Sequence, residues 1–207
     1  MSVAIIDYGS GNLRSVAKAF ERIAAGKQVV VTNDPAALKN ASHIVLPGVG
    51  AFADCMRGLK QITGMIDALE EQVLEHKKPF LGICVGMQML FQKGHEHGLH
   101  DGLGWLIGEV VALPQQPHKI PHMGWNTLAI KHDHPLLKGI QEGAHAYFVH
   151  SYHAVGCDRA DVLATVDYGQ EITAIVARGN IIGTQFHPEK SQATGLALLK
   201  NFVGIAA

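Results

Sequence analysis

One cysteine of this chain lies in a pattern that is typical of an enzymatic nucleophile. Cys84 has Gly82 two residues before it and Gly86 two residues after it, between an apolar strand-like stretch and a helix expected to run through Phe91. This is the spacing of a nucleophile elbow with cysteine in place of serine. Glycines are expected because neighbours on so tight a turn crowd each other, and the helix N-terminus favours the reactive thiolate. A buried core cysteine is the alternative.

A base and its orienting carboxylate are predicted at the end of another apolar segment. Residues 181–186 run directly into His187, Pro188 and Glu189. In an extended backbone, residues i and i+2 point the same way, so His187 and Glu189 should project together. The imidazole would take the thiol proton, and the carboxylate would fix the ring and stabilise its charged form. Taken alone, these three residues would better fit a turn at the end of a strand with an exposed histidine.

Strands and helices alternate along the first half of the chain, and this order decides where the motifs meet. Apolar strands are expected at residues 3–7, 28–31, 42–46 and 79–84. Helices are expected at residues 13–24, from Asp34 as N-cap onward, at 51–60 and at 65–77. Such alternation favours a doubly wound parallel sheet, whose sites lie at the carboxyl ends of the strands. The loops after Asp7, Pro47 and Cys84 should therefore share one edge.

After Gly94 the pattern changes to strands separated by turns. Strands are expected at residues 108–113, 127–131, 146–153, 162–168 and 172–186, the last with a hairpin tip at 178–180, and a helix begins near Ser191. No linker or repeat divides the chain, so a single domain over residues 1–207 is expected. The predicted fold class is α/β, a mostly parallel doubly wound sheet flanked by helices, with an added antiparallel β layer in the C-terminal half.

The composition narrows the range of functions. Of 207 residues 47% are hydrophobic and 17% charged, with a net charge of −1 and no basic run, so neither nucleic acid nor a membrane is expected as a partner. Three scattered cysteines form no disulfide framework and favour a cytoplasmic location. The 13 histidines are densest at residues 95–100 and 132–134 but lack zinc-site spacing, so no metal is expected.

Together, residues 82–88 and 183–189 resemble the motifs of the class I, or triad, glutamine amidotransferases, in the family's order. The resemblance implies that Cys84 attacks the side-chain amide of glutamine, with His187 as acid and base and Glu189 as its orienting group. Ammonia then leaves, and the glutamyl thioester is hydrolysed to glutamate. No cofactor is implied.

The resemblance also assigns the groups around the nucleophile. The elbow places one backbone oxyanion donor at Val85, and the family places the second in the segment of Gly48, Val49 and Gly50. Because glycine accepts either sign of φ, this segment is predicted to act as a switch that turns its donors inward when a partner binds. Val49 and Gly50 are the predicted oxyanion residues of that segment. The predicted glutamine-binding residues are Gly48, Gln88, Glu96, Ser151 and Tyr152.

Further stretches, at residues 6–13, 47–52, 120–126, 147–152 and 187–191, resemble one branch of the family, whose members dock on a (β/α)8-barrel cyclase subunit and pass ammonia directly to it. That branch places Asn12, Trp125, Asn126, Tyr147 and Lys190 at or near the interface; for Trp125 a place in the core is the alternative. Three competing functions stay open: another triad amidotransferase, such as an anthranilate or aminodeoxychorismate synthase subunit, a stand-alone cysteine hydrolase, and a non-catalytic module.

Overall fold

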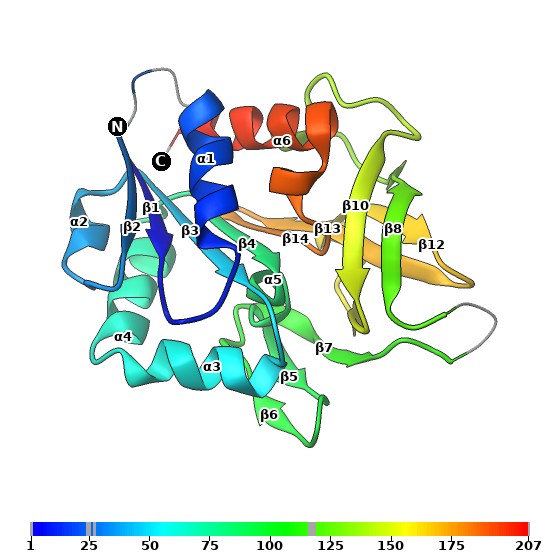
Figure 1. Cartoon of the computed structure of the whole chain (residues 1–207), viewed down its shortest axis with the longest axis horizontal. Coiled ribbons are helices and arrows are strands. Elements are labelled where there is room, and N and C mark those ends of the chain that lie inside the picture. Colours follow the sequence, from blue (N-terminus) through cyan, green and yellow to red (C-terminus); the bar gives the residue numbers. More distant parts are fainter. Residues whose placement is uncertain (1, 24–25, 27, 116–118, 207) are drawn as a thin grey trace.

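An eight-stranded sheet forms the centre of the molecule (Figure 1). The computed structural model describes residues 2–23, 26, 28–115 and 119–206. The strands, in spatial order, are β2 (Gln28–Thr32), β1 (Ser2–Ile6), β3 (His43–Gly48), β4 (Phe80–Cys84), β14 (Ile181–Thr184), β13 (Glu171–Arg178), β12 (Val162–Asp167) and β9 (Ala129–Ile130). Neighbours from β2 to β14 pair in parallel, and those from β14 to β9 pair antiparallel. The predicted fold class is confirmed.

Helices cover both faces of this sheet (Figure 1). The helices α1 (Leu13–Ile23) and α6 (Gln192–Gly204) lie on one face, and α3 (Phe52–Gln61) and α4 (Met65–Leu69) on the other. The remaining helical elements are α2 (Ala37–Asn40), the π-helix η1 (Glu70–Glu75), α5 (Val85–Gln88) and the 3-10 turns η2 (Pro135–Leu137), η3 (Arg159–Asp161) and η4 (Pro188–Lys190). Phe20 of α1 is buried and meets Phe202 of α6 edge-on, which joins the two helices.

Two smaller sheets stand beside the main one. The first, here called the ribbon, consists of β8 (His122–Thr127) and β10 (His145–His150) paired antiparallel. The second has the order β11 (Tyr152–Val155), β7 (Leu106–Ala112), β5 (Phe91–Gly94), β6 (His100–Asp101). The added antiparallel layer is thus divided between an extension of the main sheet and these two sheets, and β5 pairs in parallel with β7.

Several predicted boundaries were wrong. The helix after Cys84 ends at Gln88, because the carbonyls of Met89 and Leu90 accept N–H groups from residues 103 and 106, which start the path into β5. The second helix begins at Ala37, because the Asp34 carboxylate caps a turn by accepting from Ala36 N–H. The strands at residues 91–94, 100–101 and 122–126 were not predicted. Residue 24, the predicted end of the first helix, lies outside the described residues.

Two glycines let the elbow approach its neighbours. A Cβ on Gly82 would meet the carbonyl oxygen of Gly86 at 2.5 Å, which confirms the predicted crowding within the turn. A Cβ on Gly86 would meet the carbonyl oxygen of Leu46 at 1.8 Å, so that glycine is required by the close approach of α5 to β3. The sequence predicted only the first of these two contacts.

Replacing Gly86 with alanine should disrupt this approach, because the Leu46 carbonyl belongs to a strand in the middle of the sheet and cannot move aside cheaply. We expect the free energy of unfolding, measured by urea denaturation, to fall by about 3 kcal/mol or more. Gly204→Ala is the matched control, since a Cβ there meets nothing within 4 Å. Equal losses in both variants would contradict the steric explanation.

Candidate active site

Cys84 sits in a strained backbone conformation where β4 ends and α5 begins. Its φ is 55° and its ψ −113°, which a non-glycine residue adopts only when its surroundings enforce it. The side chain is buried. Its sulfur lies 3.9 Å from the carbonyl oxygen of Val149, to which the thiol donates, and 3.9 Å from the amide nitrogen of Gln185, which donates to it. The predicted elbow is confirmed.

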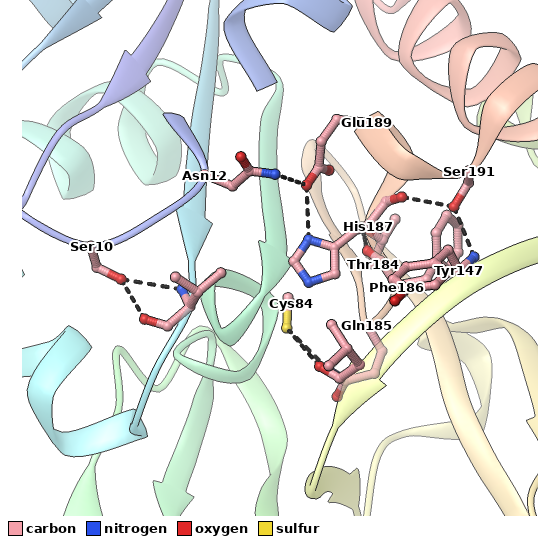
Figure 2. Close-up of polar contacts among 12 residues, drawn as sticks. Ser10, Asn12, Cys84, Tyr147, Thr184, Gln185, Phe186, His187, Glu189 and Ser191 are labelled. Carbon is pink, nitrogen blue, oxygen red and sulfur yellow. Dashed lines mark hydrogen bonds and ion pairs between the residues drawn. The ribbon is translucent and has the colours of Figure 1, made fainter. Parts of the chain in front are cut away.

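His187 and Glu189 form a buried pair beside the sulfur (Figure 2). The Nδ1 atom of His187 lies 2.8 Å from Oε1 of Glu189, and the two side chains are 2% and 0% exposed. The expected reason was wrong: β14 ends at Thr184, and Glu189 lies in the 3-10 turn η4 rather than in extended backbone. The turn folds the carboxylate back onto the ring. Asn12 donates to the same carboxylate oxygen at 3.2 Å.

The other ring nitrogen of His187, Nε2, points toward Cys84 in Figure 2 and has no partner among the described side-chain and backbone groups. Burial lowers the pKa of this imidazole, but the Cys84 sulfur that Nε2 faces and the hydrogen-bonded carboxylate of Glu189 outweigh it and raise the pKa to about 9. The folded protein therefore favours the imidazolium at neutral pH, and the proton is lost as the pH rises through about 9. An imidazolium next to a sulfur is poised to protonate a leaving group.

A cavity of about 310 Å³ opens over the sulfur and the imidazole. It brings together most of the predicted substrate and oxyanion residues, namely Val49, Gly50, Val85, Gln88, Glu96, Ser151 and Tyr152. Gly48 lies behind this wall, where a Cβ would meet the backbone nitrogen of Gly86 at 2.7 Å, so its role is to allow close packing. One oxygen of Glu96 accepts from the N–H of Phe52 at 2.7 Å, which fixes the carboxylate at the cavity rim.

In the loop after β3, the N–H group of Val49, a predicted oxyanion donor, is hydrogen-bonded to Ser10 and not directed at the cavity over Cys84. The N–H of Val49 donates to the hydroxyl of Ser10 at 3.1 Å, and that hydroxyl donates to the carbonyl of Val49 at 2.6 Å (Figure 2). The hydroxyl of Tyr8 donates to the carbonyl of Pro47 at 2.6 Å. In this conformation the Val49 amide must turn before it can serve an oxyanion over Cys84.

The predicted interface residues fall into two groups. Trp125 and Tyr147 meet with ring centroids 5.8 Å apart, and the ammonium of Lys190 lies 5.9 Å from the Tyr147 ring. These three form a surface cluster next to the triad, because the Tyr147 carbonyl accepts from the His187 N–H. The amides of Asn12 and Asn126 instead bond within the chain, to Glu189 and to the backbone of Asp167.

Sequence reasoning missed residues that the structure places at the site. Ser10 holds the Val49 peptide, Gln185 contacts the sulfur, and His150 lines the cavity wall. Gln185 and His150 lie within stretches that resemble the family, so their position beside His187 and Ser151 was a usable signal. Ser10 also lies in such a stretch, but its contact joins loops 39 residues apart, which the local pattern did not indicate.

No helix within the described part of the chain is long and apolar enough to cross a membrane. Among those same residues, no three His, Cys, Asp or Glu side chains gather closely enough to hold a metal ion.

The fold and the triad together define a class of enzyme, and comparison with known proteins agrees. Residues 4–205 match the family model of glutamine amidotransferase class-I, so the chain belongs to this family. The fold is also that of a solved glutamine amidotransferase, at a TM-score of 0.76 and 18% identity over 99% of this chain and 100% of that one. The structure of PurLQS from Thermotoga maritima gives 0.73 at 21% identity, over 98% and 96%.

Similar sequences narrow the class further. The chain is 57% identical to the imidazole glycerol phosphate synthase subunit HisH of Rhodospirillum rubrum, over 98% of both proteins. It is 53% identical to the subunit of the same name from Rhodopseudomonas palustris, again over 98% of both.

The raised pKa of His187 should depend on its anionic partners. In a histidine-labelled sample followed by NMR, we expect the ring to titrate near pH 9. In Glu189→Gln the midpoint should fall by roughly 1–3 units, because a raising charge is removed and the effect of burial remains. Glu21→Gln, at an exposed position of α1, is the control and should leave the midpoint unchanged. An unshifted midpoint in Glu189→Gln would show that the pair does not set the protonation state.

Proposed function

We propose that this chain is the glutaminase subunit of an imidazole glycerol phosphate synthase. It hydrolyses glutamine to glutamate and ammonia, and it delivers the ammonia to a (β/α)8-barrel cyclase subunit that makes imidazole glycerol phosphate and AICAR in histidine biosynthesis. The observation that carries the chemistry is Cys84 on a strained elbow, facing the His187–Glu189 pair across one cavity. The names of relatives more than half identical over nearly the full length support the choice of synthase.

The residues have the following roles in the reaction. The thiolate of Cys84 attacks the side-chain amide carbon of glutamine, and the oxyanion is stabilised by the backbone N–H groups of Val85 and the Val49–Gly50 segment. His187 gives its proton to the leaving nitrogen, so the C–N bond breaks and ammonia departs. The ring, now neutral, takes a proton from water, which attacks the thioester and releases glutamate and the thiolate.

Dependence on a partner follows from the resting loop. The Val49 amide is bonded to Ser10, so the isolated chain lacks one oxyanion donor. Removing one such donor typically costs about 10²–10³ in rate. We infer that docking of the cyclase turns this peptide toward Cys84. Glutamine is then consumed only when an acceptor for ammonia is present, which matters because free ammonia mostly protonates at neutral pH.

The surface beside the triad suits such a partner. Trp125 of the ribbon is 47% exposed and Met123 is 62% exposed, although both are large and apolar. Exposed aromatic and methionine side chains near a basic residue such as Lys190 are typical of interface centres. The family match spans residues 4–205, and we infer one domain in one heterodimer, working in the cytoplasm.

The deciding measurement is glutamate formation from glutamine. The chain should be assayed alone, with the barrel cyclase subunit of the same organism, and with that subunit plus its nucleotide substrate. We expect low turnover alone and stimulation by two orders of magnitude or more in the full complex, roughly what one restored oxyanion donor contributes. Cys84→Ala should be inactive throughout.

Other results would point elsewhere. Full activity without a partner would indicate a stand-alone hydrolase, and stimulation by an anthranilate or aminodeoxychorismate synthase partner would indicate another amidotransferase. Activity in none of these assays would remove the proposed function and leave the fold intact.

Loss of the Ser10 hydroxyl should raise the turnover of the isolated chain. Ser10→Ala removes the bond from the Val49 N–H and the bond to the Val49 carbonyl, but the carbonyl keeps the Cys55 thiol at 3.5 Å. The net loss is therefore about one hydrogen bond, worth about 1 kcal/mol, so roughly a fivefold rise is expected. Turnover in the full complex should stay unchanged, because the bond is absent in the turned state. Ser10→Thr keeps the hydroxyl and should behave as the original chain. If Ser10→Ala left the unstimulated rate unchanged, Ser10 would not hold the resting state.

A further inference from the structure

A continuous chain of hydrogen bonds runs through the inside of the ribbon to the cavity. It begins at Asn126 of β8, whose amide orientation is set by two backbone groups. Its oxygen accepts from the N–H of Thr127 at 2.7 Å, and its nitrogen donates to the carbonyl of Asp167 at 2.8 Å. A backbone N–H can only donate and a carbonyl can only accept, so the amide cannot be reversed.

This orientation determines the protonation of two histidines that face each other across the ribbon. Asn126 donates its second N–H to Nε2 of His122 at 3.2 Å, so that nitrogen is unprotonated. His122 therefore carries its proton on Nδ1 and donates it to Nε2 of His150 at 2.9 Å. The proton of His150 must then be on Nδ1, which donates to the carbonyl of Tyr152 at 2.9 Å.

The chain continues from Tyr152 to the nucleophile. The same carbonyl accepts from the amide of Gln88 at 2.9 Å, and Gln88 donates its other N–H to the side-chain oxygen of Gln185 at 3.1 Å. The nitrogen of Gln185 donates to the sulfur of Cys84 at 3.9 Å. Two directed paths thus meet at the Tyr152 carbonyl, one from the ribbon and one from the elbow.

The surroundings keep the two histidines rigid and neutral. Both are buried, and the His122 ring is stacked on Phe148 and Tyr168 at centroid distances of 4.8 and 4.0 Å. Burial lowers the pKa of His150 to about 3, outweighing the bond to Tyr152, and the neighbouring imidazoles lower it further. A fixed neutral tautomer is a reliable directional donor and acceptor at working pH.

Burying two imidazoles where apolar rings would fit costs folding free energy unless their ring nitrogens form hydrogen bonds. The hydrogen-bond chain from Asn126 through His122 and His150 to Tyr152 is here called the relay. The opposite face of β8 carries the exposed Met123 and Trp125, so the relay starts behind the surface proposed to meet the partner. It ends on the backbone of Ser151 and Tyr152, which lines the cavity.

We propose that His122 and His150 are positioning residues. They hold the Tyr152 carbonyl, and through it the Gln88 amide, at a fixed position relative to strand β8, which faces the proposed partner. This rests on the proposed function, because it assigns the relay to the glutamine pocket of the same site. The relay keeps the wall of that pocket shaped for glutamine; neither histidine touches the reacting atoms.

Kinetics with three variants test the relay in the complete complex with the cyclase. His150→Phe keeps the ring size but removes the donor to Tyr152, and His150→Asn restores a donor near the Nδ1 position. His43→Phe is the matched control, because His43 is equally buried but lies outside the relay, against Ile205 and Phe202. Melting temperature is recorded for each.

We expect His150→Phe to raise KM for glutamine roughly five- to tenfold, as loss of one hydrogen bond predicts, with kcat within about twofold. His150→Asn should recover most of the affinity. His43→Phe should lower the melting temperature without changing KM. An unchanged KM in His150→Phe, or an equal rise in His43→Phe, would overturn the proposal.

Histidine nitrogen NMR on the original chain gives a test that needs no activity. Both His122 and His150 should be neutral with the proton on Nδ1 near pH 7. A proton on Nε2 of either ring would overturn the relay. If both rings carry the proton on Nδ1 while glutaminase activity is absent with every partner, the relay geometry stands and the proposed function fails.

Discussion

The active site depends on one steric contact, the approach of α5 to the backbone of β3 at Gly86 and Leu46. Because no side chain fits between them, the chain must turn within a single residue, and Cys84 takes up the strain. The same contact lays the loop after β3 beside the sulfur, so the nucleophile and the predicted oxyanion segment are placed together. A wider spacing would relax the cysteine and separate it from the donors it needs.

The positive charge of His187 and the negative charge of Glu189 lie next to each other in the site, with Nδ1 and Oε1 2.8 Å apart. Glu189 is buried, and such a carboxylate is costly unless it is paired and hydrogen-bonded. Its Oε1 atom receives His187 and Asn12, whereas Oε2 has no partner within the described residues. The imidazolium lies between this carboxylate and the sulfur, and both groups favour its charged form. Asn12, predicted as an interface residue, thus also orients the triad.

Local spacing predicted the elbow and the alternation of the first half, since each depends on neighbours in sequence. It also brought His187 and Glu189 together, but for the wrong reason, because Glu189 lies in a 3-10 turn. Of the ribbon, β10 was predicted but β8 was not, because β8 inverts the usual strand pattern. Its inward positions are polar, with His122 and Asn126, and its outward positions are apolar, with Met123 and Trp125. A strand that buries polar side chains on one face and exposes apolar side chains on the other has the reverse of the usual alternation. The turn that folds Glu189 back likewise depends on tertiary contacts.

The cavity has one wall that moves at little cost and one that does not. Turning the Val49 peptide breaks the bonds to the Ser10 hydroxyl and the 3.5 Å bond from the Cys55 thiol to the Val49 carbonyl. The segment lies next to a glycine, Gly50, with open space around it. Moving the opposite wall would separate Tyr152 from two donors and strand buried polar groups, at about 1–3 kcal/mol for each. A partner that docked on the ribbon, as proposed, would therefore meet a rigid support on that side, and its binding energy would be available to turn the loop. Under this proposal, the asymmetry lets one interface both preserve the predicted glutamine pocket and complete the predicted oxyanion site.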